Sequence, residues 1–161
     1  MAVNRGKEFE SRFKESLLLE PLKISVDRFP DPAMGYAGIK NICDFVVYKH
    51  PTLYYFECKA CHGTTLNFNT GISANQWEGL AEKSKIYGVI AGVVVWFVDY
   101  DITTFVRIQD LLQHKEDGKK SLNIKDIEQH NIRNTKVPGK KLIKFFKYEG
   151  LEFLNTLNVG R

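Results

Sequence analysis

Two acidic residues and a lysine have the types and the spacing that metal-assisted hydrolysis requires. Asp44 lies in the apolar run 41–48, whereas Glu57 and Lys59 lie in the run 53–59. Both runs are rich in the β-branched and aromatic residues that favour strands. Because side chains alternate along a strand, Glu57 and Lys59 share one face of it. Carboxylate oxygens bind hard divalent cations, and a nearby ammonium group stabilises negative charge.

The segment between the two runs determines how their side chains meet. Residues 49–52 (Lys-His-Pro-Thr) predict a four-residue hairpin turn. If Tyr48 pairs with Leu53, Asp44 falls directly opposite Glu57. Like charges in this position destabilise a sheet, so a divalent cation between the carboxylates is expected. Oxygen ligands suit Mg²⁺, with Mn²⁺ as a substitute.

The same residues resemble the D…ExK core of the PD-(D/E)xK nucleases, and further matches resemble the RecU-type Holliday-junction resolvases. Asn4-Arg5-Gly6 followed by Glu10 is similar to their NRG…E opening. Residues 54–60 are similar to their aromatic-rich catalytic strand, and Asn75-Gln76 falls where the family carries a glutamine. Order and spacing match from residue 4 to about residue 112. Two departures are the segment Pro30 to Ile42, shorter than the family's stalk, and the tail after Gln113, which matches nothing in it.

The resemblance implies a mechanism and a role for each site residue. It implies a metal-dependent endonuclease with four catalytic residues: Asp44, Glu57, Lys59 and Gln76. The expected metal ligands are Asp44, Glu57, the backbone carbonyl of Cys58, and Glu10 as an accessory or water-mediated ligand. Two of these have structural alternatives. Gln76 completes an S-x-x-Q capping box with Ser73, and Glu10 is also a typical solvated helix acid.

Basic residues concentrate in the tail of the chain. From His114 to Lys147, ten lysines and arginines against four acids give a net charge of +6, which leaves −2 for the rest of a chain with a total of +4. A basic segment beside an acidic metal site suits a polyanionic substrate. The expected DNA contacts are Arg5, Lys140, Lys141 and Lys144. The alternatives are a solvated lysine-rich surface and, for Arg5, a terminal charge.

Apolar periodicity and turn residues predict one α+β domain over 1–161, a mixed sheet flanked by helices, as the resemblance also implies. A nuclease core is expected over 1–113 and a basic C-terminal extension over 114–161. The predicted helices are 7–19, 73–87 and 109–115, and the predicted strands are 22–29, 41–48, 53–59, 89–98 and 103–108. An edge segment is expected at 64–68 and a turn at 70–71. In the tail we predict a charged loop over 116–139 with a helical turn at 124–129, a strand at 142–148 and a helix at 149–157.

Three cysteines, Cys43, Cys58 and Cys61, form no strong metal or redox motif. Cys58 and Cys61 make a C-x-x-C, but the first lies in a predicted strand, and no second ligand pair completes a zinc site. We interpret all three as buried, reduced core residues. The predicted hairpin places Cys43 and Cys58 on the side away from the carboxylates.

Composition excludes some classes of protein. With 161 residues, 43% apolar and 26% charged, the chain is ordinary for a single globular domain. The longest apolar run, Val89 to Val98, is too short to span a bilayer, which takes about 20 residues. The polar start, Met1 to Glu10, offers no signal-peptide core, so a cytoplasmic location without membrane contact is expected.

Three functions remain open from sequence. The first is a Holliday-junction resolvase that makes paired symmetric nicks in four-way DNA junctions and, like the family, acts as a homodimer with two-fold symmetry. The second is another PD-(D/E)xK nuclease, of the restriction or DNA-degrading kind. The third is a non-catalytic DNA-binding protein, against which the intact Asp44, Glu57 and Lys59 argue.

Overall fold

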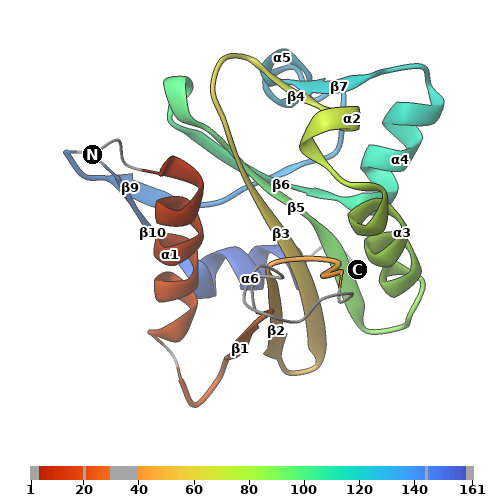
Figure 1. The fold of residues 1–161 in the computed structure, drawn as a ribbon. Helices are drawn as coiled ribbons and strands as arrows, with labels where there is room; N and C mark the ends of the chain where they lie inside the picture. The colour runs from red at the N-terminus through yellow and green to blue at the C-terminus, as the bar shows by residue number, and fades with distance from the viewer. Residues whose placement is uncertain (1–3, 20, 30–39, 144, 159–161) are drawn as a thin grey trace.

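The computed structural model describes residues 4–19, 21–29, 40–143 and 145–158, and its centre is a six-stranded mixed sheet flanked by helices (Figure 1). In spatial order the strands are β1 (Ser25–Arg28), β2 (Phe45–Lys49), β3 (Thr52–Cys61), β5 (Val89–Phe97), β6 (Ile102–Arg107) and β8 (Thr135–Lys136). Two small sheets pair β4 (Thr65–Asn67) with β7 (Ser121–Asn123) and β9 (Gly139–Lys141) with β10 (Phe146–Tyr148). The helices are α1 (Arg5–Leu18), α2 (Phe68–Gly71), α3 (Ala74–Ser84), α4 (Ile108–Glu116), α5 (Ile124–Glu128) and α6 (Gly150–Asn158), with the 3₁₀ turn η2 (Val98–Tyr100). The predicted α+β class is confirmed.

The strand β3 lies in the interior of the sheet, between β2 and β5. It pairs antiparallel with β2 and parallel with β5. The connection from β3 to β5 passes through α3, as a parallel pair requires a crossover. This placement buries most of β3, and the aromatic side chains of Tyr54 and Phe56 are fully enclosed.

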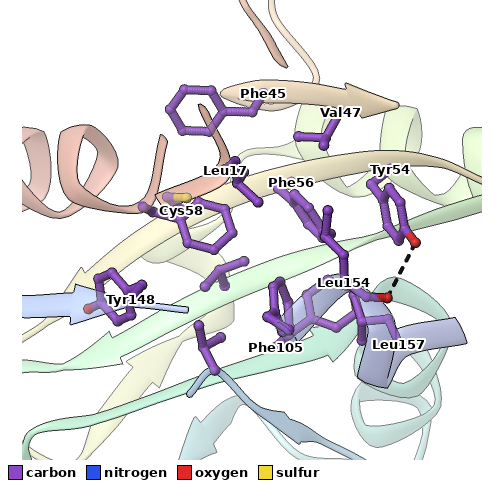
Figure 2. Packing of buried hydrophobic residues seen from close by; sticks show 14 of the residues in the cluster. Leu17, Phe45, Val47, Tyr54, Phe56, Cys58, Phe105, Tyr148, Leu154 and Leu157 are labelled. Carbon is purple, nitrogen blue, oxygen red and sulfur yellow. Dashed lines mark hydrogen bonds between the residues drawn. The ribbon is translucent and has the colours of Figure 1, made fainter. Parts of the chain in front are cut away.

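Two apolar cores lie on opposite faces of the sheet. On one face, α1 and α6 cover the even-numbered side chains of β3, and Phe9, Phe13 and Leu17 form the predicted stripe of α1. Figure 2 shows this core, where the hydroxyl of Tyr54 donates to the Leu154 carbonyl at 3.5 Å. On the other face α2, α3, α4 and α5 supply the second core. The sheet is therefore covered on both sides, which holds its strand ends in fixed positions.

The basic tail supplies core residues as well as surface charge. Val137, Tyr148 and Phe153 belong to the same core as α1, and β8 extends the sheet beside β6. The hydroxyls of Tyr148 and Thr103 lie 3.1 Å apart. The division into a core and an extension stays a prediction, but these tail residues pack as part of the central fold.

The register of the catalytic hairpin was predicted correctly, whereas several connections were not. Tyr48 pairs with Leu53 as expected, but Lys49 also pairs with Thr52, so the turn has two residues instead of four. Of the predicted strand at 142–148 only Phe146–Tyr148, β10, is a strand, and it pairs with β9, which precedes that range. The strands β7 and β8 form within the predicted loop 116–139. The strands β7 and β8 pair with the distant strands β4 and β6, a pairing that local sequence patterns do not reveal. The shortened stalk segment falls largely on residues 30–39, outside the described residues.

Of the helices in the described part of the chain, none has the length and apolar character needed to cross a membrane.

Candidate active site

Backbone hydrogen bonds hold Asp44 at the point where the chain enters β2. Its amide donates to the Phe56 carbonyl at 3.1 Å, and its carbonyl accepts from the Phe29 amide at 3.1 Å. Its carboxylate accepts the backbone N–H of Cys58 at 2.8 Å. The register of β2 against β3 ends at Phe45 and Phe56, and Asp44 precedes it. The charge of Asp44 still acts on Glu57, so the two acids lie close together as the sequence predicted, although not as a strand pair. Both the backbone and the side chain of Asp44 are therefore fixed.

Glu57 is a nearly buried acid whose two carboxylate oxygens have different surroundings. Its side chain is 4% exposed, and Oε1 lies 2.7 Å from the Nζ of Lys59, which is 23% exposed. Among the described residues Oε2 is buried and has no hydrogen-bond donor. The charge of Asp44 acts on Glu57, because the two carboxylates lie close together. Two ionised carboxylates are both acceptors, so a hydrogen bond between them would need a proton on one of them.

The electrostatics of this pair favour protonation when no metal is bound. Burial, followed by the charge of Asp44, raises the pKa of Glu57 to about 7, against the opposing effect of Lys59. Burial also raises the pKa of Asp44, although the Cys58 N–H and the charge of Lys59 lower it. Both groups therefore gain by accepting a cation, whether a proton or a metal ion.

Glu10 lies near the pair but is engaged by an arginine. The Nη2 of Arg28, on β1, is 2.9 Å from Oε2 of Glu10, on α1. Burial and then the charge of Asp44 raise the pKa of Glu10, and Arg28 lowers it. Within the described residues, no three His, Cys, Asp or Glu side chains are grouped so as to hold one metal ion together. The accessory role of Glu10 stays a prediction.

Sequence reasoning missed Arg28 as a neighbour of the site. It pairs with Phe45 across β1 and β2, and the next residue, Phe29, is hydrogen-bonded to Asp44. The side chain of Arg28 is 47% exposed, and its charge lowers the pKa of both Glu10 and Asp44. Its position at the end of a predicted strand was the one indication in the sequence that it could lie near the site. The register of β1 against β2, which decides the matter, cannot be predicted from local sequence patterns.

Gln76 makes the capping box that was its structural alternative. Its Oε1 accepts the Ser73 backbone N–H at 3.0 Å, and its own N–H donates to the Ser73 hydroxyl at 3.2 Å. The preceding residue, Asn75, donates to the carbonyls of Lys40 and Asn41, in the segment that leads to Asp44. The catalytic role expected for Gln76 stays a prediction.

Of the residues expected to contact DNA, the three that the structure describes lie around the hairpin β9–β10. The guanidinium carbon of Arg5 is 5.7 Å from the centre of the Phe145 ring, next to β10. Lys140 and Lys141 are exposed on β9, and Lys141 forms an ion pair with Asp101. Lys144 lies outside the described residues. The structure brings Arg5 and the hairpin together, and contact of these residues with DNA stays a prediction.

The three cysteines are free and buried, as interpreted from the sequence. The prediction that Cys43 shares a side with Cys58 is wrong, because the two belong to cores on opposite faces of the sheet. The irregular backbone before β2 breaks the strand alternation on which that prediction depended. Burial, then the charges of Glu57 and Asp44, raises the pKa of Cys43 to about 12.

A comparison with protein families decides what kind of protein carries this site. The sequence model of the family described as recombination protein U (RecU) matches residues 5–149. The chain belongs to the RecU family. This membership confirms the function predicted from sequence, a Holliday-junction resolvase of DNA recombination, and thus an endonuclease that binds DNA. The match also extends past Gln113, where the resemblance seen in the sequence ended.

Comparisons with solved structures and with curated proteins assign no further residue of the site. Among solved structures, one similar chain is Hjc, a Holliday junction resolvase from the archaeal hyperthermophile Archaeoglobus fulgidus. The two are 23% identical with a TM-score of 0.42, over 62% of this chain and 77% of that one. A similarity this distant assigns no residue of the site. The comparison with curated proteins gives no match.

Proposed function

We propose that this RecU-family chain hydrolyses DNA phosphodiesters with a divalent metal, Mg²⁺ or Mn²⁺, at the corner formed by Asp44, Glu57 and Lys59. One observation carries this proposal. Glu57 Oε2 is buried without a donor among the described residues, while Oε1 is paired with Lys59. A buried carboxylate oxygen without a partner costs about 1–3 kcal/mol or more. A cation that binds there would recover that free energy.

The donor set fits a magnesium-like ion. Asp44 and Glu57 would hold it, with the backbone carbonyl of Cys58 as a further oxygen ligand and Glu10 acting through a water. Mg²⁺ usually keeps several waters and takes only one or two carboxylates, so a group of three acidic ligands is not needed. When bound, such an ion acidifies a water molecule and polarises a phosphoryl oxygen.

Lys59 is suited to stabilise the negative charge that develops on the phosphate during attack. The ion pair with Glu57 fixes its ammonium group beside the acids, and its side chain remains partly open to solvent. In a site that excludes water, one fixed cation aimed at the developing charge is worth roughly 10²–10³ in rate. Arg28 adds a second, more exposed positive charge at the rim, near Asp44.

The substrate we propose is the four-way junction, cut by two symmetric nicks. Two symmetric cuts require two sites related by a two-fold axis, so we propose a homodimer of this chain. The exposed lysines of β9 and the neighbouring Arg5 would contact the phosphate backbone and supply affinity. Cleavage of linear duplex with no preference for junctions is the alternative, and it corresponds to another type of PD-(D/E)xK nuclease.

A substrate panel tests this proposal. Labelled four-way junction, linear duplex and plasmid DNA are incubated with Mg²⁺, Mn²⁺ or a chelator, and the products are resolved on gels. We expect metal-dependent, paired nicks in the junction alone, and light scattering should give twice the chain mass of 18.5 kDa. Asp44→Asn should bind the junction but lose cleavage by roughly 10²–10³ or more. Full cleavage by Asp44→Asn would remove this corner from the mechanism, and equal cleavage of all substrates would favour the alternative.

A further inference from the structure

One face of α3 packs against the segment 40–44, which carries Asp44 into the site. This face consists of Asn75, Gly79 and Lys83, each four residues apart and therefore aligned along the helix. We propose that Asn75 is a positioning residue for Asp44, and that this face of α3 clamps the backbone on which Asp44 depends. The inference rests on the proposed role of Asp44 as a metal ligand.

The side-chain amide of Asn75 makes two hydrogen bonds to this segment. Its Nδ2 donates to the Lys40 carbonyl at 3.1 Å and to the Asn41 carbonyl at 2.9 Å. The segment lies outside the regular strand, which begins at Phe45, so those carbonyls belong to no strand ladder. A primary amide carries two N–H donors, one for each carbonyl. Asn75 therefore replaces the ladder bonds that would otherwise fix this backbone.

Gly79 provides a second, independent contact one helical turn further along. A Cβ at this position would lie 2.2 Å from Cγ2 of Ile42 and 2.6 Å from its Cβ. Both distances are well below van der Waals contact, so a larger residue would push Ile42 away. Ile42 is two residues before Asp44, and the helix thus approaches the segment closely enough that only glycine fits.

The third residue of the face extends the contact onto the hairpin itself. The Nζ of Lys83 lies 5.7 Å from the centre of the Tyr55 ring, on β3. Tyr55 pairs with Val46, which follows Asp44 by two residues on β2. The face therefore contacts the chain both before Asp44 and across from the strand that follows it.

The contacts of Asn75 and Gly79 reach the metal site through the backbone that leads to Asp44. If the Asn75 amide is lost, residues 40 and 41 each lose one hydrogen bond, and the backbone at Asp44 gains freedom. Removal of a group that orients a metal ligand typically lowers metal affinity or activity about 10–100-fold. We expect Asn75→Ala to fall in that range, although Asn75 itself need touch neither metal nor DNA.

The experiment compares Asn75→Ala with Ser73→Ala in the full chain. Ser73→Ala removes the hydroxyl half of the capping box of the same helix, so it reports the effect of a weakened α3 without the clamp. Binding of Mn²⁺ is measured by calorimetry, and exchange of the Asp44 amide, which is bonded to Phe56, is followed by NMR. We expect Asn75→Ala to bind Mn²⁺ about 10–100-fold more weakly and to lose protection at Asp44. Ser73→Ala should retain the wild-type Mn²⁺ affinity and the protection of the Asp44 amide, although its melting temperature should fall by about as much as that of Asn75→Ala.

Two further variants keep the proposal testable if Asn75→Ala folds poorly. Gly79→Ala leaves Asn75 in place and raises helix propensity, yet it should also weaken Mn²⁺ binding because it displaces Ile42. Asp44→Asn separates the two proposals. Wild-type Mn²⁺ affinity in Asp44→Asn would overturn the metal site itself. Weak binding in Asp44→Asn, with wild-type affinity and protection in Asn75→Ala and Gly79→Ala, would overturn the clamp alone.

Discussion

Two strand pairs in this molecule bring like charges together, and they differ in burial. Where the chain enters β2, the amide of Asp44 bonds to the carbonyl of Phe56, the neighbour of Glu57, and Glu57 is 4% exposed. In the hairpin β9–β10, Lys140 pairs with Lys147, and both are exposed. Water screens the lysines, so their repulsion is small and their charge remains available to a polyanion. The acids lack much of that screening, so a nearby cation stabilises them more strongly.

This difference in burial gives the acids and the lysines different roles in the proposed function. At the acidic corner, charge, fold and chemistry are coupled, and one substitution should change stability and catalysis together. On the hairpin, charge should change only the encounter with DNA. Each of the following predictions tests one side of this contrast, beginning with the largest effect.

The largest effect is expected from Lys59→Met, which retains much of the side-chain length but removes the charge. Cleavage of a four-way junction should fall roughly 10²–10³-fold, because the developing phosphate charge loses its fixed cation. In metal-free protein at about pH 8 the variant should also be destabilised, since Glu57 keeps a buried charge without its partner. Single-turnover cleavage and urea denaturation measure the two effects.

Lys85→Met is the matched control, because Lys85 is exposed at the end of α3 and forms no ion pair among the described residues. It should leave cleavage within a few-fold of wild type. A Lys59→Met protein that cleaves at the wild-type rate would show that the ion pair is structural only.

A smaller effect concerns the stability of metal-free protein as a function of pH. The folded-state pKa of Glu57 is raised from 4.5 to about 7, so the folded state binds more protons than the unfolded state between these values. Stability is therefore greatest below the unfolded pKa and falls as pH rises through about 7. The raised pKa values of Asp44 and Glu10 act in the same direction. We expect a loss of roughly 1–3 kcal/mol between about pH 5 and pH 8.

Glu57→Gln tests which residue causes that slope. It should flatten the pH dependence and leave stability at about pH 8 unchanged or slightly higher, because it relieves the repulsion from Asp44. The exposed substitution Glu116→Gln is the control and should keep the wild-type slope. A strong loss of stability in metal-free Glu57→Gln would mean that Glu57 has a structural partner besides Lys59.

The sequence was most informative where local patterns determine the structure. The stripe of Phe9, Phe13 and Leu17, the Ser73 capping box and the pairing of Tyr48 with Leu53 all follow from short-range rules. Alternation along β3 then placed Glu57 and Lys59 on one face.

The features that the sequence did not predict depend on contacts between segments that are distant in the chain. Arg28 meets Glu10 across 18 residues, and Asn75 reaches back 35 residues to Lys40. The pairing of β4 with β7 likewise joins segments that no local pattern relates. Cys43 was misplaced because the backbone before β2 is irregular and the alternation rule stops there.

The smallest effect is expected on the exposed side of the comparison, at the lysines of the hairpin. If β9–β10 contacts DNA, neutralising Lys140, Lys141 and Lys144 should weaken junction binding and reduce the slope of log K against log salt by about 0.9 for each lost phosphate contact. Lys141 also pairs with Asp101, so its share of the slope should be the smaller. Cleavage at saturating protein should recover, because the acidic corner is untouched. Junction-binding isotherms at several salt concentrations measure the slope, with Lys49→Ala, at a half-buried lysine, and Lys85→Ala, at an exposed one, as the control. Identical slopes for the triple variant and wild type would assign these lysines to solubility, and DNA contact would then have to lie elsewhere on the surface.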